Sequence, residues 1–224
     1  MDPSLIKPVA EATKAVAETG GKAIDATAGF ARIFKGPVAE LIGCVEDKFK
    51  YVRWERRQAL IEKAEAHMRR KGLTAPTREL PLPFSVPLLT AGVLEENDEL
   101  QDIWARLLVN AGDAWTEMEL RTAYIEILRG MSAFDVKNLK LMAEVSLTSK
   151  EQFRVLETWY LPESVRLRDK LARDVGRVPP ELGVSLANLA RLGCATPAGG
   201  WDGVVLFGLM TVTDLGIALF KACS

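Results

Sequence analysis

The sequence predicts a mainly α-helical protein: a helical bundle with one long helix in the N-terminal half and a winged-helix-like C-terminal unit carrying a small β-hairpin. Three observations support this. Apolar residues recur at three- and four-residue steps over 37–71, and similar patterns fill 86–176, as on one face of a helix. Near the C-terminus a helical pattern precedes two short apolar runs around the glycine-rich segment 198–203, and a last helical pattern follows.

The first segment, residues 1–36, is rich in alanine and glycine and poor in large apolar side chains. We expect two weak helices, over 4–19 and 22–35, that need a partner surface, because short isolated helices are marginal in water. Two roles stay open. The segment covers the core of its own chain, or it is mobile and packs on a partner subunit or enters a membrane interface.

A long basic amphipathic helix is expected over 37–72. Pro37 fits its first turn, where a missing N–H costs nothing, and Gly72 fits its C-terminal cap. Residues 73–85 contain three prolines. Because proline biases the preceding residue away from helix, we expect an extended connector there.

The helical core spans 86–176. Three helix starts resemble capping boxes, in which a hydroxyl and an acidic side chain three residues later satisfy backbone N–H groups: Thr116 with Glu119, Ser132 with Asp135, and Thr148 with Glu151. The expected helices cover 86–95, 98–112, 117–131, 133–146, 149–160 and 163–176.

The C-terminal unit, 177–224, is expected to contain a helix over 180–192, strands over 194–197 and 204–210, and a closing helix over 212–223. A helix that reads DNA is usually basic, because phosphate contacts dominate affinity. Residues 180–192 contain one base, Arg191, and one acid, Glu181. Protein contacts or internal packing therefore suit this unit better than DNA reading.

Composition points to a core-forming protein without recognisable chemistry. The 224 residues have a formal net charge of −1 and contain 48% hydrophobic residues. The only histidine is His67, and the three cysteines, Cys44, Cys194 and Cys223, are widely spaced, which is unlike a zinc site or a disulfide framework. We therefore expect no enzyme activity, cofactor or metal, and with no signal peptide evident, a cytoplasmic protein.

Paired carboxylates are the one feature that could serve acid–base or metal chemistry. The structural interpretation is favoured, because acidic residues at the start of a helix complement its dipole. The residues are Glu95, Glu96, Asp98, Glu99 and Asp102.

Charge is unevenly distributed. Residues 48–71 hold nine bases and three acids, whereas 90–126 hold nine acids and two bases. The basic helix could bind nucleic acid or an anionic membrane. The favoured alternative is that it faces the acidic segment, within the chain or in an oligomer. The candidate interaction surface is Lys48, Lys50, Arg53, Trp54, Arg56, Arg57, Arg69, Arg70 and Lys71.

Four stretches resemble the Abi-alpha family (abortive infection protein alpha), over roughly residues 30–223: 94–108 around Trp104, 132–135, 189–193, and 212–216 with Phe220, Ala222 and Cys223. Val212 stands where leucine is expected, a conservative change. The resemblance implies a bacterial, cytosolic protein that defends against phage by stopping growth of the infected cell. It carries over no catalytic residue. The motif residues are interpreted as structural: Trp104, Leu107, Leu108, Gly216, Phe220 and Cys223.

The leading hypothesis is an anti-phage protein that acts non-enzymatically through protein or membrane contacts, as a homo-oligomer or with a protein partner. The alternative is a nucleic-acid-binding module that uses the basic helix 48–71. A third hypothesis is an enzyme in which the Glu95–Asp102 carboxylates hold a divalent metal.

Overall fold

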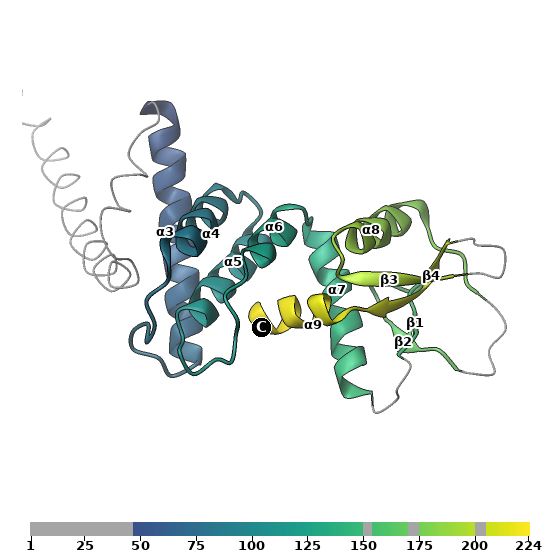
Figure 1. Cartoon of the computed structure of the whole chain (residues 1–224). Coiled ribbons are helices and arrows are strands. Elements are labelled where there is room, and N and C mark those ends of the chain that lie inside the picture. The colour runs from purple at the N-terminus through teal and green to yellow at the C-terminus, as the bar shows by residue number, and fades with distance from the viewer. Residues whose placement is uncertain (1–46, 150–153, 170–174, 200–204) are drawn as a thin grey trace, which may run out of the picture. The chain divides into compact units, whose positions relative to one another are not determined.

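The computed structural model describes residues 47–149, 154–169, 175–199 and 205–224, and Figure 1 shows its helices and strands. This part of the chain is mainly helical, as predicted, with one small antiparallel sheet. The chain divides into two units. Within the described residues, unit 1 holds 47–95 and 104–119, and unit 2 holds 96–103 and the residues from 120 onward. The weak helices predicted within 1–36 lie outside the described residues.

Unit 1 is built on α3 (Asp47–Arg70), which packs against α4 (Leu82–Leu94). The predicted apolar stripe of α3 is its buried face, with Leu60, Ala64 and Met68 in the core. A Cβ atom on Gly92 would lie 3.0 Å from the Leu60 side chain and 3.3 Å from Cβ of Trp104. The absence of a side chain at position 92 therefore lets α4 approach its neighbours closely.

The long helix ends where the sequence predicts. Gly72 has a φ of +72°, and the N–H of Leu73 donates to the Met68 carbonyl over 2.9 Å, which is a glycine-based C-terminal cap. The predicted connector is wrong at its far end, because α4 begins at Leu82 rather than at 86. Prolines are tolerated in the first turn of a helix, where their missing N–H has no helical partner.

The remaining helices are α5 (Asp98–Ala111), α6 (Thr122–Arg129), α7 (Ala133–Thr148), α8 (Pro180–Arg191) and α9 (Asp214–Ala222). The capping box of Ser132 with Asp135 is confirmed at the start of α7. The one predicted for Thr116 with Glu119 is wrong, since α6 begins at Thr122. The hydroxyl of Thr116 donates instead to the carbonyls of Asn110 and Asp113, both over 2.6 Å.

The helices predicted over 149–160 and 163–176 are wrong. These stretches contribute β1 (Leu156–Glu157) and β2 (Arg166–Leu167) to a four-stranded antiparallel sheet of order β2-β1-β4-β3. Thr148 ends α7 instead of starting a helix, and Glu151 lies outside the described residues. Leu156 pairs with both Leu167 and Met210, so partners distant in sequence decide the strand, which local patterns do not reveal.

The predicted C-terminal hairpin is present as β3 (Ala195–Gly199) and β4 (Val205–Val212). In Figure 1, α8 runs alongside β3, with which it packs, and α9 packs on α7. A Cβ atom on Gly216 would collide with the carbonyl oxygen of Cys194. Close approach of α9 to the start of β3 therefore requires glycine at this position.

Candidate interaction surfaces

The predicted basic surface of α3 is divided by the structure. Trp54 is 48% exposed, Arg56 and Arg57 are partly exposed, and Arg69 and Arg70 are exposed at the far end of the helix. The side chains of the other three predicted bases, Lys48, Lys50 and Arg53, lie outside the described part. The described part of the predicted surface therefore consists of two groups on α3. Trp54 with Arg56 and Arg57 forms one group, and Arg69 with Arg70 forms the other.

The last base of the surface is used inside unit 1. The ammonium group of Lys71 donates to Oδ1 of Asn110 over 2.8 Å and to Oδ2 of Asp113 over 3.0 Å. Asp113 belongs to the acidic segment 90–126. This one pair joins Lys71, directly after α3, to the acidic segment within the chain.

Asp113 is held as a carboxylate. Burial alone would raise its pKa, but the hydrogen bond from Lys71, the backbone N–H of Trp115, the charge of Lys71 and the hydroxyl of Thr77 together lower the pKa below its ordinary value. An opposite charge and hydrogen bonds to the ionised form favour that form. The pair therefore ties the end of α3 to the loop that follows α5.

That loop, residues 112–121, presents an aromatic side chain that sequence reasoning missed. Trp115 is 84% exposed, although its backbone is fixed. Its own N–H donates to Oδ1 of Asp113 over 3.0 Å, and the N–H of Ala114 donates to Oγ1 of Thr77 over 2.7 Å. The sequence gives no signal for this exposure. Large aromatic residues are mostly interior, so a buried tryptophan is the ordinary expectation.

A second buried polar cluster joins α7 to α8 in unit 2. The carboxylate of Asp135 accepts from the hydroxyl of Ser185 over 2.5 Å, from Nδ2 of Asn188 over 3.0 Å, and from both the N–H and the hydroxyl of Ser132 over 2.8 Å. Nδ2 of Asn138 donates to the hydroxyl of Ser185 over 3.0 Å. The carboxylate of Asp135 and the hydroxyl of Ser185 are satisfied within the cluster, whereas Oδ1 of Asn138 is buried without a hydrogen-bond partner. The bonds between Asp135, Asn138, Ser185 and Asn188 make the cluster a structural joint between two helices.

The outer face of α8 is almost uncharged. Its buried side is formed by Leu182, Ser185, Leu186 and Leu189. On the opposite side Val184 is 72% exposed, between Glu181 and Arg191. The guanidinium group of Arg191 donates to Oδ1 of Asn188 over 2.8 and 3.1 Å. This face therefore offers an apolar centre with one acid and one base.

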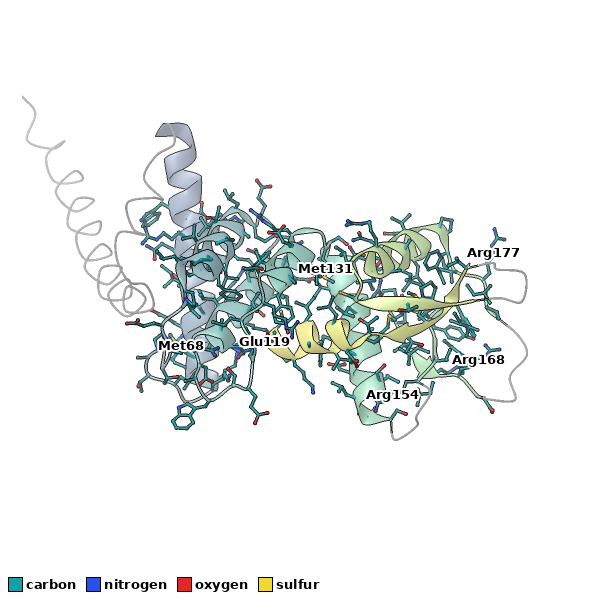
Figure 2. The ribbon with its side chains drawn as sticks, in the orientation of Figure 1. Met68, Glu119, Met131, Arg154, Arg168 and Arg177 are labelled. Atoms are coloured by element: carbon teal, nitrogen blue, oxygen red, sulfur yellow. The ribbon has the colours of Figure 1, made fainter. Side chains whose placement is uncertain are left out.

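The β1–β2 pair forms a third polar cluster. The sequence analysis did not predict it, because it expected helices in this stretch. Glu157 is buried and accepts from Nε of Arg166 over 2.7 Å, with Arg168 at 4.0 Å. The hydrogen bond with Glu157 raises the pKa of Arg166. The guanidinium group of Arg166 also lies 5.2 Å from the ring centre of Tyr160, a cation–π distance. Figure 2 labels Arg168 in this part of unit 2, with Arg154 and Arg177.

The acidic residues between Glu95 and Asp102 lie around the start of α5. In the part of the chain that the structure describes, no three histidine, cysteine, aspartate or glutamate side chains are placed to hold a metal ion. The side chain of Asn97 accepts from the N–H groups of Glu99 and Leu100, both over 3.0 Å, at the start of α5. The segment therefore begins a helix, and the hypothesis of a carboxylate-bound metal lacks the convergence that it requires.

The single histidine and two of the cysteines lie in the interior. Nδ1 of His67 lies 3.3 Å from Nη2 of Arg70, on the same helix. Cys194 and Cys223 are buried free thiols, and burial raises the pKa of Cys194 to about 11. A thiol that stays protonated at neutral pH is a poor nucleophile.

The residues that carried the family resemblance lie in or against the core. Trp104, Leu107 and Leu108 are buried in α5, Gly216 meets the Cys194 carbonyl, Cys223 is buried, and Phe220 is partly exposed.

Among the described residues no helix has the length and apolar character needed to cross a membrane. No curated protein and no solved structure matches the chain significantly. The family model described as abortive infection alpha matches residues 55–223. The chain therefore belongs to the abortive infection alpha family.

Proposed function

We propose that this protein acts in abortive infection without catalysing a reaction, through contacts between an exposed face of unit 2 and a protein partner. Family membership supports the role in defence against phage. The observation that carries the mode of action is the outer face of α8, with exposed Val184 at its centre. An exposed apolar side chain with few charges around it suits the middle of a protein interface, where charged residues are depleted.

The same face is unsuited to nucleic acid. Phosphate contacts need several bases, whereas the only base on α8 is Arg191, whose guanidinium group is already held by Asn188. The described strands β3 and β4 contain no charged residue. If this part of unit 2 is a winged-helix-like module, it is one that contacts protein.

The winged-helix interpretation is itself part of the proposal. Helix α8 is followed directly by the antiparallel pair β3–β4, and β1, which comes before α8, pairs with the other side of β4. A helix followed by a hairpin, with an earlier strand completing the sheet, supports this assignment. Fold alone does not fix function, so the chemistry of the α8 face decides between protein and nucleic acid.

The test is protection of bacteria that express the full chain and are challenged with phage. Val184→Glu places a charge at the centre of the face and should bring the efficiency of plating back toward that of cells without the protein. The matched control is Leu147→Glu, which puts the same charge on an exposed leucine of α7 in the same unit. It should protect as the wild type does. Full protection by a folded Val184→Glu protein would overturn the proposal.

A second candidate function, nucleic-acid binding, is favoured by the surface around Trp54 in the N-terminal half of α3. Trp54 is half exposed beside Arg56 and Arg57, and aromatic side chains among bases are typical of surfaces that stack on single strands. The test is retention of RNA and DNA by the full chain at rising salt. Retention that falls steeply with salt and is lost in the Arg56→Glu/Arg57→Glu variant supports this function. Unchanged retention in that variant removes it.

A further inference from the structure

Helix α4 differs from the other helices that the structure describes, because it alone contains no charged residue. Its inner side is buried in unit 1 through Phe84, Leu88 and Ala91. The opposite side is exposed, with Leu82 at 48% and Leu94 at 52%. We call the residues on that side the α4 outer face: Leu82, Pro83, Val86, Pro87, Thr90 and Leu94.

The α4 outer face offers almost nothing polar to water. Its only polar side chain is that of Thr90, whose hydroxyl donates to the Val86 carbonyl of the same helix over 2.8 Å. The exposed side of α7, by contrast, carries Lys137, Lys140 and Glu144. A helix that is apolar on all sides is normally enclosed by other elements, and contiguous apolar surface marks an interaction site. The composition of the α4 outer face is therefore that of a covered surface.

The absence of charge narrows the choice of occupant. A helix that binds an anionic membrane surface or a nucleic acid uses lysine and arginine side chains, and α4 contains neither. The side chains on an apolar helix face pack well against those of a second helix. What suits this face is therefore an apolar helical segment of protein.

The chain itself supplies such a segment. Residues 22–35 lie outside the described residues and are joined through 36–46 to Asp47, the first residue of α3. Helix α3 packs against α4 (Figure 1), and a Cβ atom on Gly92 would meet the Leu60 side chain. Leu60 lies thirteen residues from Asp47, or about 20 Å along the helix, whereas the eleven connecting residues, if extended, span about 36 Å. The connection is therefore long enough to bring the segment back to α4.

The sequence of this segment suits the α4 outer face. Phe30, Ile33 and Phe34 follow one another at helical spacing, so they lie on one side of the helix predicted over 22–35. A short helix needs a partner surface to be stable, and attachment to α3 makes this contact intramolecular. We propose that residues 22–35 pack on the α4 outer face of the same chain, with Phe30, Ile33 and Phe34 against it.

This inference goes beyond the proposed function, because it concerns unit 1 and needs no partner of the α8 face. Of the two roles left open for residues 1–36, it selects the one in which the segment covers its own chain. Its failure would leave the proposal for the α8 face untouched.

The first experiment measures how fast iodoacetamide alkylates a cysteine placed on the face in the full chain. Leu94→Cys replaces a side chain that is 52% exposed, and the matched site, Leu147→Cys, replaces one on α7 that is 40% exposed. From these exposures alone the two thiols should react at similar rates. If residues 22–35 cover the face, the thiol of Leu94→Cys should react at least about tenfold more slowly. Peptide mass spectrometry distinguishes each new thiol from the native cysteines.

The second experiment disrupts the contact from the side of the segment. Phe30→Glu in the Leu94→Cys protein should restore the rate to that of Leu147→Cys, because a charge without a partner is costly to bury. The matched control is Arg32→Glu, which puts the same side chain on the opposite side of the predicted helix and should leave the rate slow. Slow amide hydrogen exchange in residues 104–111, which are mostly buried, verifies that unit 1 stays folded.

Four results overturn the proposal. The first is an equal rate at the two cysteine sites, and the second is a slow Leu94→Cys site that Phe30→Glu leaves slow. The third is protection that increases with protein concentration, which would show that a second copy covers the face. The fourth is protection that develops only when vesicles of neutral lipid are added, which would show that a membrane covers it.

Discussion

Asp113 in unit 1 and Asp135 in unit 2 are buried to the same extent, at 4% exposure each, yet they do different things. Asp113 is paired with a cation, Lys71, and fixes a loop that shows Trp115 to solvent. Asp135 is bonded to hydroxyls, an amide and a backbone N–H, and joins two helices in the interior. Each of these two buried aspartates therefore holds a neighbouring part of the chain in place. Asp113 holds a surface loop in unit 1, and Asp135 holds two helices together in the core of unit 2.

The largest effect is expected at the interior joint. Asp135→Ala removes the acceptor of the Ser132, Ser185 and Asn188 donors, of which Ser185 is buried, and should lower the free energy of unfolding by about 3 kcal/mol. Urea titration of the full chain measures this. Asp214→Ala is the control, because Asp214 lies exposed in the first turn of α9. If both variants lose the same stability, the joint at Asp135 has no special role.

The next effect concerns the close approach of α9 to β3. Gly216→Ala places a methyl group on the Cys194 carbonyl and should cost about 2 kcal/mol in unfolding free energy, the usual cost of overpacking. The measurement is the shift in the urea midpoint, converted with the slope of the transition. A midpoint equal to that of the wild type would mean that α9 moves away without cost and that the packing is loose.

The ion pair of Lys71 with Asp113 should contribute less, and its contribution should depend on pH. Lys71→Met removes a charge-assisted bond and should cost about 1.5 kcal/mol at pH 7. Because the folded pKa of Asp113 is lowered, its contribution is complete above the ordinary aspartate pKa of about 4 and is lost as the pH falls through the folded value. The difference between wild type and variant should therefore shrink below about pH 4. A difference that is constant from pH 7 to pH 3 contradicts this.

A smaller, stabilising effect is expected at Gly183 of α8, where a Cβ atom would meet only Cγ1 of Val178, at 3.9 Å. Gly183→Ala should raise the free energy of unfolding by about 0.5–1 kcal/mol, since glycine inside a helix costs about that much relative to alanine. Thermal unfolding of this variant and of Gly216→Ala, side by side, compares a glycine with open space around it with a glycine that is in close contact. Destabilisation by Gly183→Ala would mean that α8 is more tightly enclosed than its geometry indicates.

The smallest effect should be at Trp115 itself. Trp115→Ala removes a side chain that is mostly in water, so the free energy of unfolding of the monomer should change by less than about 0.5 kcal/mol. Urea titration at a concentration where monomer predominates measures it. A loss of 2 kcal/mol or more would show that Trp115 serves the fold, and the contrast between the Asp113 and Asp135 clusters would disappear.

Much of the fold follows from local patterns. The helix over 98–112, the capping box of Ser132 with Asp135, the helix over 180–192 and the hairpin were all predicted close to their observed bounds. In each case neighbouring residues carry the signal, as an apolar repeat or a side chain that bonds the adjacent backbone. The family is likewise recognisable from core residues around Trp104.

The misses have a common physical cause. Leu156–Glu157 forms a strand because Leu156 meets Met210, more than fifty positions away, and Arg166–Leu167 pairs with that strand. Local preference yields to such pairing. The charge counts did not predict that Lys71 would bond to Asn110 and Asp113 inside unit 1 while Arg69 stays exposed. The exposure of Trp115 and Val184 depends on how the elements pack, which no local pattern encodes. Interaction surfaces were thus harder to predict than the core.

The most direct test of the central claim is growth of expressing cultures infected at low and at high ratios of phage to cells. If the protein stops growth of the infected cell, the culture should survive at the low ratio and stop growing at the high ratio, and Val184→Glu should abolish this pattern while the protein stays folded. Survival at both ratios would contradict abortive infection, and an unchanged pattern in the folded Val184→Glu variant would contradict a role for the α8 face.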